Sequence, residues 1–437
     1  MGGFTNSEDE VIVDFRPGAK FPRLPAGKLI LVTNPVDPVQ LEIMHQLLEG
    51  GCQVRAAVTF CEPAEWLDEL FDRFHRNGSF RRQSFVYGRP GYQLNWRHLV
   101  RGCHGIVHQT VVPTRFDTIE QLWRQVINTT AGLLEAAERE ENMESFVHTA
   151  SYKNAAPIHT EKDLEVTAKS WHVPVLWAGA RTPGIPAVVR ASCLYRAEQT
   201  VWSWTEEANP KFRVNTIAPS NVIGHHLAPD YMEPYWNDWL HDMYRCRGIA
   251  IDYVEDAGVL QRHWYIDVED VGRLHVAALF DHTIKRQRLF AWGCLRDRND
   301  AIQILRAHMV ERIKRRGGTM YDQEKAEEAA AVHYPDIVGD TIGYGQTYTD
   351  TTNVMDIFER WKGFRGWKAF ETSVPECIAR YEQILAEKAQ KGAQGHLSYT
   401  NGRDTHDINE LLPFDTGIFV KLEPPPALKF TDKDGGW

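Results

Sequence analysis

Hydrophobic and polar positions alternate near the start of the chain in a pattern that predicts a strand, a turn, a helix and a second strand. Lys28–Thr33 (KLILVT) is a short apolar run, which predicts a buried strand. Apolar residues then recur at helical spacing between positions 41 and 48, and Gly50-Gly51 ends the predicted helix. Gln53–Phe60 (QVRAAVTF) predicts the next strand. This order is typical of the first half of a doubly wound nucleotide-binding fold.

The same alternation continues to about residue 300. The further predicted strands are His104–Thr110, Ser145–Ser151 and Phe212–Ile217, the predicted helices are Ile119–Arg139 and Val188–Ala208, and Trp264–Leu279 returns to a strand followed by a helix. Alternating strands and helices form a parallel sheet with helices on both faces. The predicted fold class is therefore α/β, with a doubly wound parallel sheet in residues 28–300.

The remaining segments do not follow this alternation. Residues 225–262 are rich in Tyr, Trp and His and contain no clean strand, and we expect them to join residues 301–390 in a smaller C-terminal substrate lobe. Residues 1–27 form a leader that contains Pro and Gly, and residues 391–437 form an irregular tail with little periodicity.

Composition narrows the class of protein. The chain has 437 residues, of which 43% are hydrophobic and 25% are charged, enough to bury a sizeable core. A formal net charge of −10 argues against a general nucleic-acid binder. No apolar run reaches the ~18 residues that a membrane span needs. The seven cysteines are scattered, odd in number and without a CxxC pair, which predicts free thiols and a cytoplasmic location.

Several stretches occur in an order and at spacings that together resemble one family. They are LILVT with its following helix, GYQLNWRHLVRGCHGIVHQT, NTTAGLLEAA, FVHTAS, NPKFRVNTIAPSNVIG and WYIDVEDVGRLHVAAL. With a C-terminal stretch they cover residues 28 to about 385, and they resemble the extended short-chain dehydrogenases/reductases of the dihydroflavonol-reductase and NAD-dependent epimerase/dehydratase type. The resemblance implies a Rossmann-like fold, an NAD(P) cofactor and a catalytic Ser, Tyr and Lys.

The chain departs from this family at the cofactor turn. Asn34, Asp37 and Gln40 stand where the family has three glycines, which let the backbone approach the pyrophosphate at the helix N-terminus. Asn can adopt the left-handed conformation. Asp37-Pro38, however, predicts a helix cap whose carboxylate lies where a phosphate should bind, and repulsion at ~4 Å is about 1–4 kcal/mol. We therefore expect NAD(P) to be absent or weakly bound. The same residues also fit a well-capped helix with no role in binding.

The catalytic pair is also missing. In the family a Tyr precedes a Lys by four residues, and the Lys lowers the Tyr pKa. Aligning Ala197, Glu198 and Trp202 with the family places Arg190 at the Tyr position and Leu194 at the Lys position. Shifting the alignment to Tyr195 yields Gln199, which is no Lys either.

Candidate catalytic residues remain on the strand that carries the family's catalytic Ser. They are His148, Ser151 and Tyr152, because a hydroxyl beside an imidazole can move a proton at neutral pH. His148 also fits a buried core residue, and Ser151 an ordinary hydroxyl at a strand end. Tyr152 and Lys153 face opposite ways on an extended backbone, so they pair only if the chain turns there.

Other polar groups are expected at neighbouring strand ends, but no metal is. His108, Thr110, Ser220 and Asn221 follow or end predicted strands. His225-His226 lack a third ligand at a recognisable spacing, which predicts polar loop residues and no metal site.

Three functions stay open. The first is a non-redox step, such as dehydration, isomerisation or cyclisation of a small organic molecule of the natural-product type (secondary metabolism), in the former reductase cleft. The second is an NAD(P)H-dependent carbonyl reductase or epimerase with an atypical cofactor site. The third is a non-catalytic protein that binds a ligand or another protein. The expected partner is a small-molecule ligand, with no nucleic acid and no membrane, and oligomeric state is not inferable.

Overall fold

The centre of the chain is a seven-stranded sheet in which every strand pair is parallel. The computed structural model describes residues 21–59, 64–85, 96–112, 116–157, 160–181, 186–228, 238–244, 262–317, 322–336, 345–363 and 365–393. The strand order is β10-β7-β5-β4-β1-β2-β3. The strands are β1 (Leu29–Thr33), β2 (Gln53–Thr59), β3 (Phe80–Phe85), β4 (Gly105–Gln109), β5 (Ser145–Thr149), β7 (Arg213–Pro219) and β10 (Arg288–Ala291).

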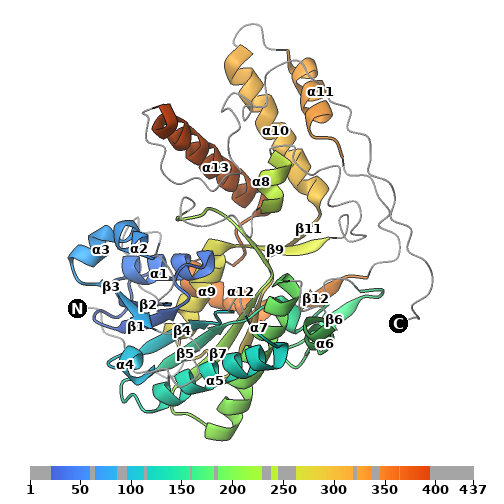
Figure 1. Cartoon of the computed structure of the whole chain (residues 1–437). Helices are drawn as coiled ribbons and strands as arrows, with labels where there is room; N and C mark the ends of the chain where they lie inside the picture. Colours follow the sequence, from blue (N-terminus) through green and yellow to red (C-terminus); the bar gives the residue numbers. More distant parts are fainter. Residues whose placement is uncertain are drawn as a thin grey trace.

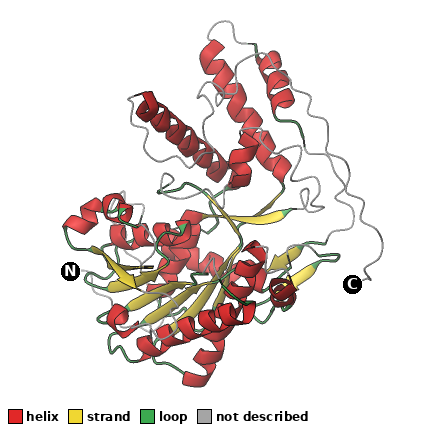
Figure 2. Ribbon diagram, viewed as in Figure 1, coloured by secondary structure: helices red, strands yellow, loops and turns green. Residues whose placement is uncertain are grey.

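Helices cover both faces of this sheet (Figures 1 and 2). One face carries α1 (Pro38–Gly50), α9 (Val268–Phe280) and α12 (Thr352–Lys362), and the other carries α4 (Trp96–Val100), α5 (Ile119–Glu138) and α7 (Pro186–Ala208). Covering on both faces explains why β1 is a continuous apolar run, with Ile30, Leu31 and Val32 buried. The predicted α/β doubly wound fold is confirmed.

Local sequence signals set the bounds of α1. Asp37 has an extended backbone and caps the helix, since its Oδ1 accepts a hydrogen bond from the Val39 N–H at 3.0 Å. Pro38 occupies the first helical position. Gly51 ends the helix in the left-handed conformation, with φ +100°, and its N–H donates to the last helical carbonyls. The cap predicted for Asp37-Pro38 is therefore confirmed.

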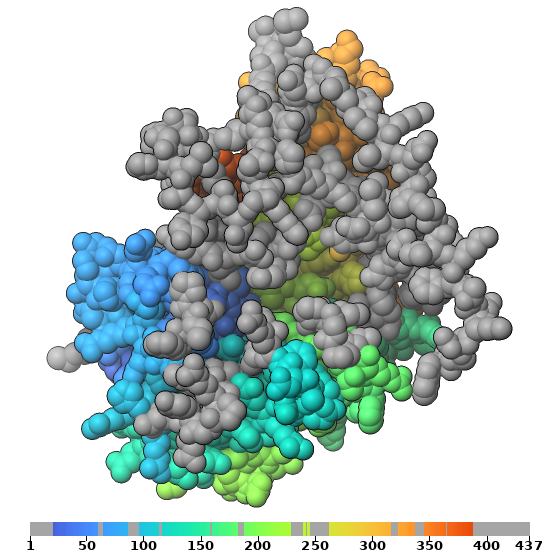
Figure 3. Space-filling model, viewed as in Figure 1, coloured from blue at the N-terminus to red at the C-terminus, as the bar shows by residue number. Residues whose placement is uncertain are grey.

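A smaller lobe lies beyond the carboxyl end of the sheet (Figure 1). It contains the strands β8 (Asn221–Ile223), β9 (His263–Asp267) and β11 (Cys294–Arg296) and the helices α8 (Asp238–Tyr244), α10 (Arg298–Gly317), α11 (Gln323–His333) and α13 (Phe370–Ala393). Their shared core includes Leu240, Tyr265, Leu305, Tyr334 and Phe370. In the space-filling view, α10 and α13 lie in the upper part of the molecule and α5 lies in the lower part (Figure 3).

Short elements complete the described chain. They are α2 (Trp66–Leu70), α3 (Asp72–Arg76), the single turn η1 (Tyr152–Asn154), α6 (Pro174–Arg181) and a two-stranded pair, β6 (Leu164–Val166) with β12 (Thr347–Thr349). Although α12 falls within residues 301–390, it packs on α9 and β10 of the large domain. Within the described residues, no helix is both long enough and apolar enough to cross a membrane.

Candidate active site

Parallel strands bring the candidate residues to one edge of the sheet. β4 pairs with β5 through Gln109 and Thr149, and β5 pairs with β7 through Thr149 and Ile217, so these three strands end at nearly the same level. Thr110, Ser151 and Ser220 follow those ends. The carboxyl edge is where doubly wound folds bind ligands, and it faces the smaller lobe (Figure 1).

The turn after β1 keeps one conformational feature of a glycine turn. Asn34 has a positive φ of 53°, in the left-handed region that asparagine tolerates. Its side-chain amide donates a hydrogen bond to the Gln109 side chain at 2.9 Å, which ties the turn to the end of β4. Asn34 therefore adopts the left-handed conformation that the sequence analysis expected asparagine to allow at this position.

Asp37 does not stand alone at this turn. One Oδ lies 3.6 Å from an Nη of Arg190, and Arg190 comes from α7 on the other face of the sheet. Burial raises the pKa of the Asp37 carboxyl, while Arg190 and the capping hydrogen bond from Val39 act in the opposite direction. The negative charge is thus offset by a guanidinium that is 153 residues away in the sequence but adjacent in space.

Gln40, which stands where the family has its third glycine, is buried in the core. Its side chain is 0% exposed, and its Nε2 donates to Thr149 Oγ1 at 2.9 Å. The Thr149 hydroxyl in turn contacts His275 Nε2 on α9 at 2.9 Å, and His275 Nδ1 bonds to the Val271 carbonyl. Gln40 therefore joins α1, β5 and α9 through a buried polar chain.

The chain turns immediately after Ser151. Ser151 Oγ accepts a hydrogen bond from the Lys153 N–H at 3.3 Å and caps η1, which carries Tyr152 and Lys153. The turn places the Lys153 ammonium 5.9 Å from the centre of the Tyr152 ring. The sequence predicted that Tyr152 and Lys153 pair only if the chain turns there, and the structure has that turn.

Tyr152 is held by aromatic and polar contacts. Its ring packs edge-on against Trp292, with 6.3 Å between ring centres. Burial raises the pKa of the Tyr152 phenol, and a hydrogen bond with the side chain of Asn221 opposes this effect only in part. The phenol therefore stays protonated at neutral pH and can donate a hydrogen bond.

His148 lies one layer deeper, in the core of the sheet. It is 0% exposed and faces α5 and α7, since side chains alternate along β5 and Thr149 faces α9. Its ring lies 5.4 Å from that of His108, and burial lowers its pKa to about 4. The structure thus separates His148 from Ser151 and Tyr152 at the edge, and its catalytic role stays a prediction.

Two buried hydroxyls at the carboxyl edge have no hydrogen-bond partner among the described residues. They are Thr110 Oγ1, after β4, and Ser220 Oγ, after β7, with their residues 2% and 5% exposed. Burying a hydroxyl without a hydrogen-bond partner costs free energy unless water or a ligand forms a hydrogen bond with it. Both were expected at strand ends from the sequence.

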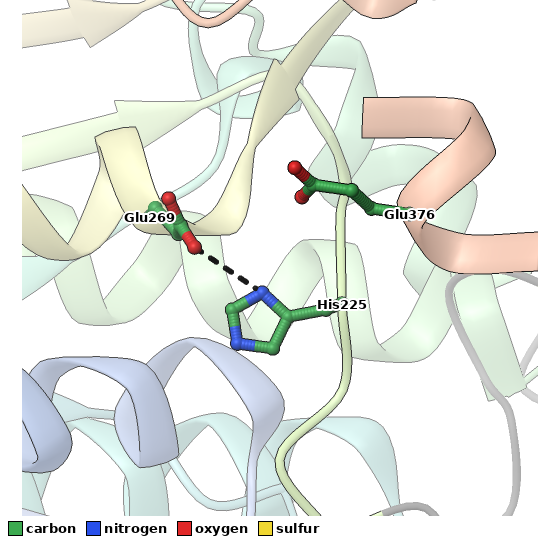
Figure 4. Close-up of side chains that lie close together, drawn as sticks. All are labelled: His225, Glu269 and Glu376. Atoms are coloured by element: carbon green, nitrogen blue, oxygen red, sulfur yellow. Dashed lines mark ion pairs between the residues drawn. The ribbon is translucent and has the colours of Figure 1, made fainter. Parts of the chain in front are cut away.

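A second cluster lies where the loop after β8 meets α9 and α13 (Figure 4). His225 Nδ1 is 3.4 Å from Glu269 Oε1, and the nearest donor atoms of His225, Glu269 and Glu376 lie within 4.8 Å of one another. The Lys368 ammonium is 3.5 Å from Glu269 Oε2 and also pairs with Glu376. A cation is therefore already present among these carboxylates, and the expected lack of a metal stays a prediction.

Arg190 is the site residue whose role sequence reasoning missed. The alignment placed it where the family has its catalytic Tyr, and that position was the available signal. Pairing with Asp37 could not be foreseen, because α1 and α7 lie on opposite faces of the sheet and meet only at its edge.

Comparison with known proteins finds relatives along most of the chain. No family model matches the chain. A ketoreductase, adrE from Penicillium rubens, is 26% identical over 366 residues, which cover 82% of this chain and 97% of the relative. An NAD-dependent epimerase/dehydratase, terH from Aspergillus terreus, is 26% identical over 304 residues, covering 65% of this chain and 83% of the relative. The chain is similar in sequence and in fold to members of the extended short-chain dehydrogenase/reductase superfamily.

A solved structure shows the same fold. Gre2 from Candida albicans in complex with NADPH superimposes with a TM-score of 0.62 at 17% identity, covering 82% of this chain and 99% of that chain.

The prediction that NAD(P) is absent or weakly bound is wrong. Relatives named as NAD-dependent and structural neighbours solved with NADPH contradict it. The prediction rested on an uncompensated charge at Asp37. In the folded chain Arg190 lies beside that carboxylate, so the repulsion on which the prediction relied is offset.

Proposed function

We propose that this protein is an NAD(P)H-dependent reductase of a carbonyl group in a small organic molecule. The observation that carries the proposal is the turn η1, which brings the hydroxyls of Ser151 and Tyr152 to the carboxyl edge beside Asn221. The names of the relatives, ketoreductase and aldehyde reductase, support the same reaction class. The nicotinamide supplies the hydride when it is bound.

The side chains at the edge have the properties that such a reaction needs. The Tyr152 phenol stays protonated, so it can donate a hydrogen bond to a carbonyl oxygen and then a proton to the alkoxide, which is a far stronger base than a phenolate. Ser151 Oγ accepts its hydrogen bond from the Lys153 N–H, which leaves its own proton for the substrate oxygen. Trp292 packs on the Tyr152 ring and fixes its direction.

The turn after β1 fits a dinucleotide through contacts that differ from those of a glycine turn. The left-handed backbone at Asn34 provides the required chain path. Arg190 offsets Asp37, which caps α1 where a pyrophosphate is expected. Asn34 and the N-terminus of α1 would hold the cofactor, with Gln40 supporting the turn from beneath.

A non-redox step is a second candidate, and one observation favours it. Arg190 and Leu194 occupy the positions of the family's Tyr and Lys, so the usual proton donor of hydride transfer is absent. Dehydration, isomerisation or cyclisation needs only an acid and a base in a shaped pocket. The same Ser151 and Tyr152 would supply them, and His148 stays a predicted participant.

Product analysis separates these reactions. The purified chain is incubated with small ketones, aldehydes and hydroxyketones, with and without NADPH, and products are followed by mass spectrometry. Reduction adds two hydrogens and consumes NADPH, dehydration removes water, and isomerisation leaves the mass unchanged. We expect reduction. Turnover of none of these substrates, with or without cofactor, would favour the binding-protein alternative.

Replacing the edge hydroxyls is expected to lower turnover. Ser151→Ala and Tyr152→Phe should each reduce kcat about 10²-fold or more, because each removes a proton donor from the reacting oxygen. Ser203→Ala and Tyr348→Phe remove the same groups at exposed positions and should leave kcat unchanged. His148→Leu, measured in the same assay, tests the predicted catalytic role of His148. Unchanged kcat in both edge variants, with folding confirmed by circular dichroism, would refute this site.

Cofactor affinity tests the role of Arg190. Calorimetric titration should give NADPH binding tighter than roughly 100 μM, about −5.5 kcal/mol. Arg190→Met should weaken binding by about tenfold or more, because it leaves the Asp37 charge uncompensated. Asp37→Asn in the Arg190→Met background should restore affinity. Failure of the second change to restore binding would show that Arg190 acts by another route than offsetting Asp37.

A further inference from the structure

The carboxyl edge of the sheet beside Ser151 and Tyr152 carries more positive charge than its described neighbours neutralise. Lys153 is half-buried, and no described residue partners its ammonium by a hydrogen bond or an ion pair. Arg190 pairs with Asp37 through one Nη at 3.6 Å, and its side chain is 46% exposed. Among the residues that the structure describes, these two cations therefore share one carboxylate, that of Asp37.

Both cations lie at the carboxyl edge, Lys153 on η1 after β5 and Arg190 beside Asp37 at the turn after β1. Burial lowers the pKa of the Lys153 ammonium first, and the charge of Arg190 lowers it further. Holding two cations together in a partly dry place costs free energy unless an anion joins them. Hydrogen bonds from charged groups to a carboxylate are among the strongest that a site can offer.

The surrounding hydroxyls fit the same ligand. Thr110 Oγ1 and Ser220 Oγ are buried at neighbouring strand ends without a partner among the described residues. Each can donate a hydrogen bond to an oxygen. Cations and unsatisfied hydroxyls at one edge of a sheet are the chemistry that recognises a carboxylate or a phosphate.

We propose that Lys153 and Arg190 form an anion subsite that binds a carboxylate on the substrate. This proposal rests on the proposed function, because it places the anion beside Ser151 and Tyr152. Arg190 stands at the sequence position of the family's proton donor, which is where the substrate reacts. The preferred substrate is thus an oxo acid or another carbonyl compound with a carboxylate, and the neutral ester is bound less well.

Binding of a simple probe tests the subsite directly. Benzoate is titrated into the full chain by calorimetry, with benzamide as its neutral counterpart. Benzoate should bind at least about tenfold more tightly than benzamide, and Lys153→Met or Arg190→Met should each remove most of this preference. Lys162→Met and Arg97→Met remove one exposed positive charge each and should leave it intact. Equal binding of benzoate and benzamide would overturn the proposal.

Two further measurements are needed. The first distinguishes a substrate carboxylate from a cofactor phosphate, and the second distinguishes failure of the subsite from failure of the proposed function. If benzoate binds equally well with and without saturating NADPH, the subsite belongs to the substrate. If NADPH abolishes benzoate binding, the anion is a cofactor phosphate and the substrate assignment is overturned. Turnover of neutral ketones but not of oxo acids would leave the reductase function standing and refute the subsite. Benzoate binding that needs both cations, without any turnover, would support the subsite and refute the function.

Discussion

Replacing Glu198 with Ala is expected to lower the free energy of unfolding by about 3–5 kcal/mol, because it leaves the buried Arg288 guanidinium without a carboxylate to balance its charge. Glu198 is 0% exposed, and its carboxylate accepts hydrogen bonds from Arg288 Nε and Nη2 at 2.8 and 3.1 Å. It also accepts from Asn154 Nδ2 at 2.8 Å and from the Thr216 hydroxyl at 3.0 Å. One side chain thus joins α7, β10, η1 and β7.

The measurement is urea unfolding followed by circular dichroism. Glu206→Ala is the matched control, because it removes an exposed carboxylate from the same helix and should change the stability by less than about 0.5 kcal/mol. Since Asn154 ends the turn that carries Tyr152 and Lys153, the Glu198 variant should also lose turnover at temperatures where it stays folded. A loss below about 1 kcal/mol would contradict this account of the buried network.

Acidification from pH 7 to pH 5 is expected to destabilise the chain through its core histidines. Burial lowers the pKa of His148 and of His275 to about 4, from an ordinary value of 6.5. Between these values the unfolded chain binds more protons than the folded one, so stability falls as the pH falls. Each residue contributes about 2 kcal/mol of loss by pH 5. His108, whose pKa burial also lowers, adds to the effect.

Substitution of His148 measures the contribution of this one histidine to the pH-dependent loss of stability. His148→Leu should fold at pH 7 and lose about 2 kcal/mol less than the parent chain between pH 7 and pH 5. Asp37 and Asp267, whose carboxyl pKa values burial raises, act in the opposite direction but equally in both chains. His98→Gln, at an exposed position, should lose as much as the parent. Identical pH profiles of the parent and His148→Leu would contradict the buried, neutral state of His148.

Local signals were enough to predict the elements and their order. The apolar run at Lys28–Thr33 formed β1, and Asp37-Pro38 capped α1, because these signals act within a few residues. Regular alternation then predicted a parallel sheet, and parallel strands placed Thr110, Ser151 and Ser220 at one edge. Up to this point, contacts between near neighbours and the rules for connecting strands determine the outcome.

The character of the site depended on contacts between distant segments. From the sequence, Asp37 was an uncompensated charge and His148 a candidate beside Ser151. In the folded chain Arg190 reaches Asp37, while the alternation of β5 turns His148 into the core. Lys153 approaches Tyr152 because Ser151 caps a turn there. The sequence by itself determined the sheet and its edge; which charges meet at that edge was decided by helix packing across the sheet, since electrostatic interactions depend on distance in space and not along the chain.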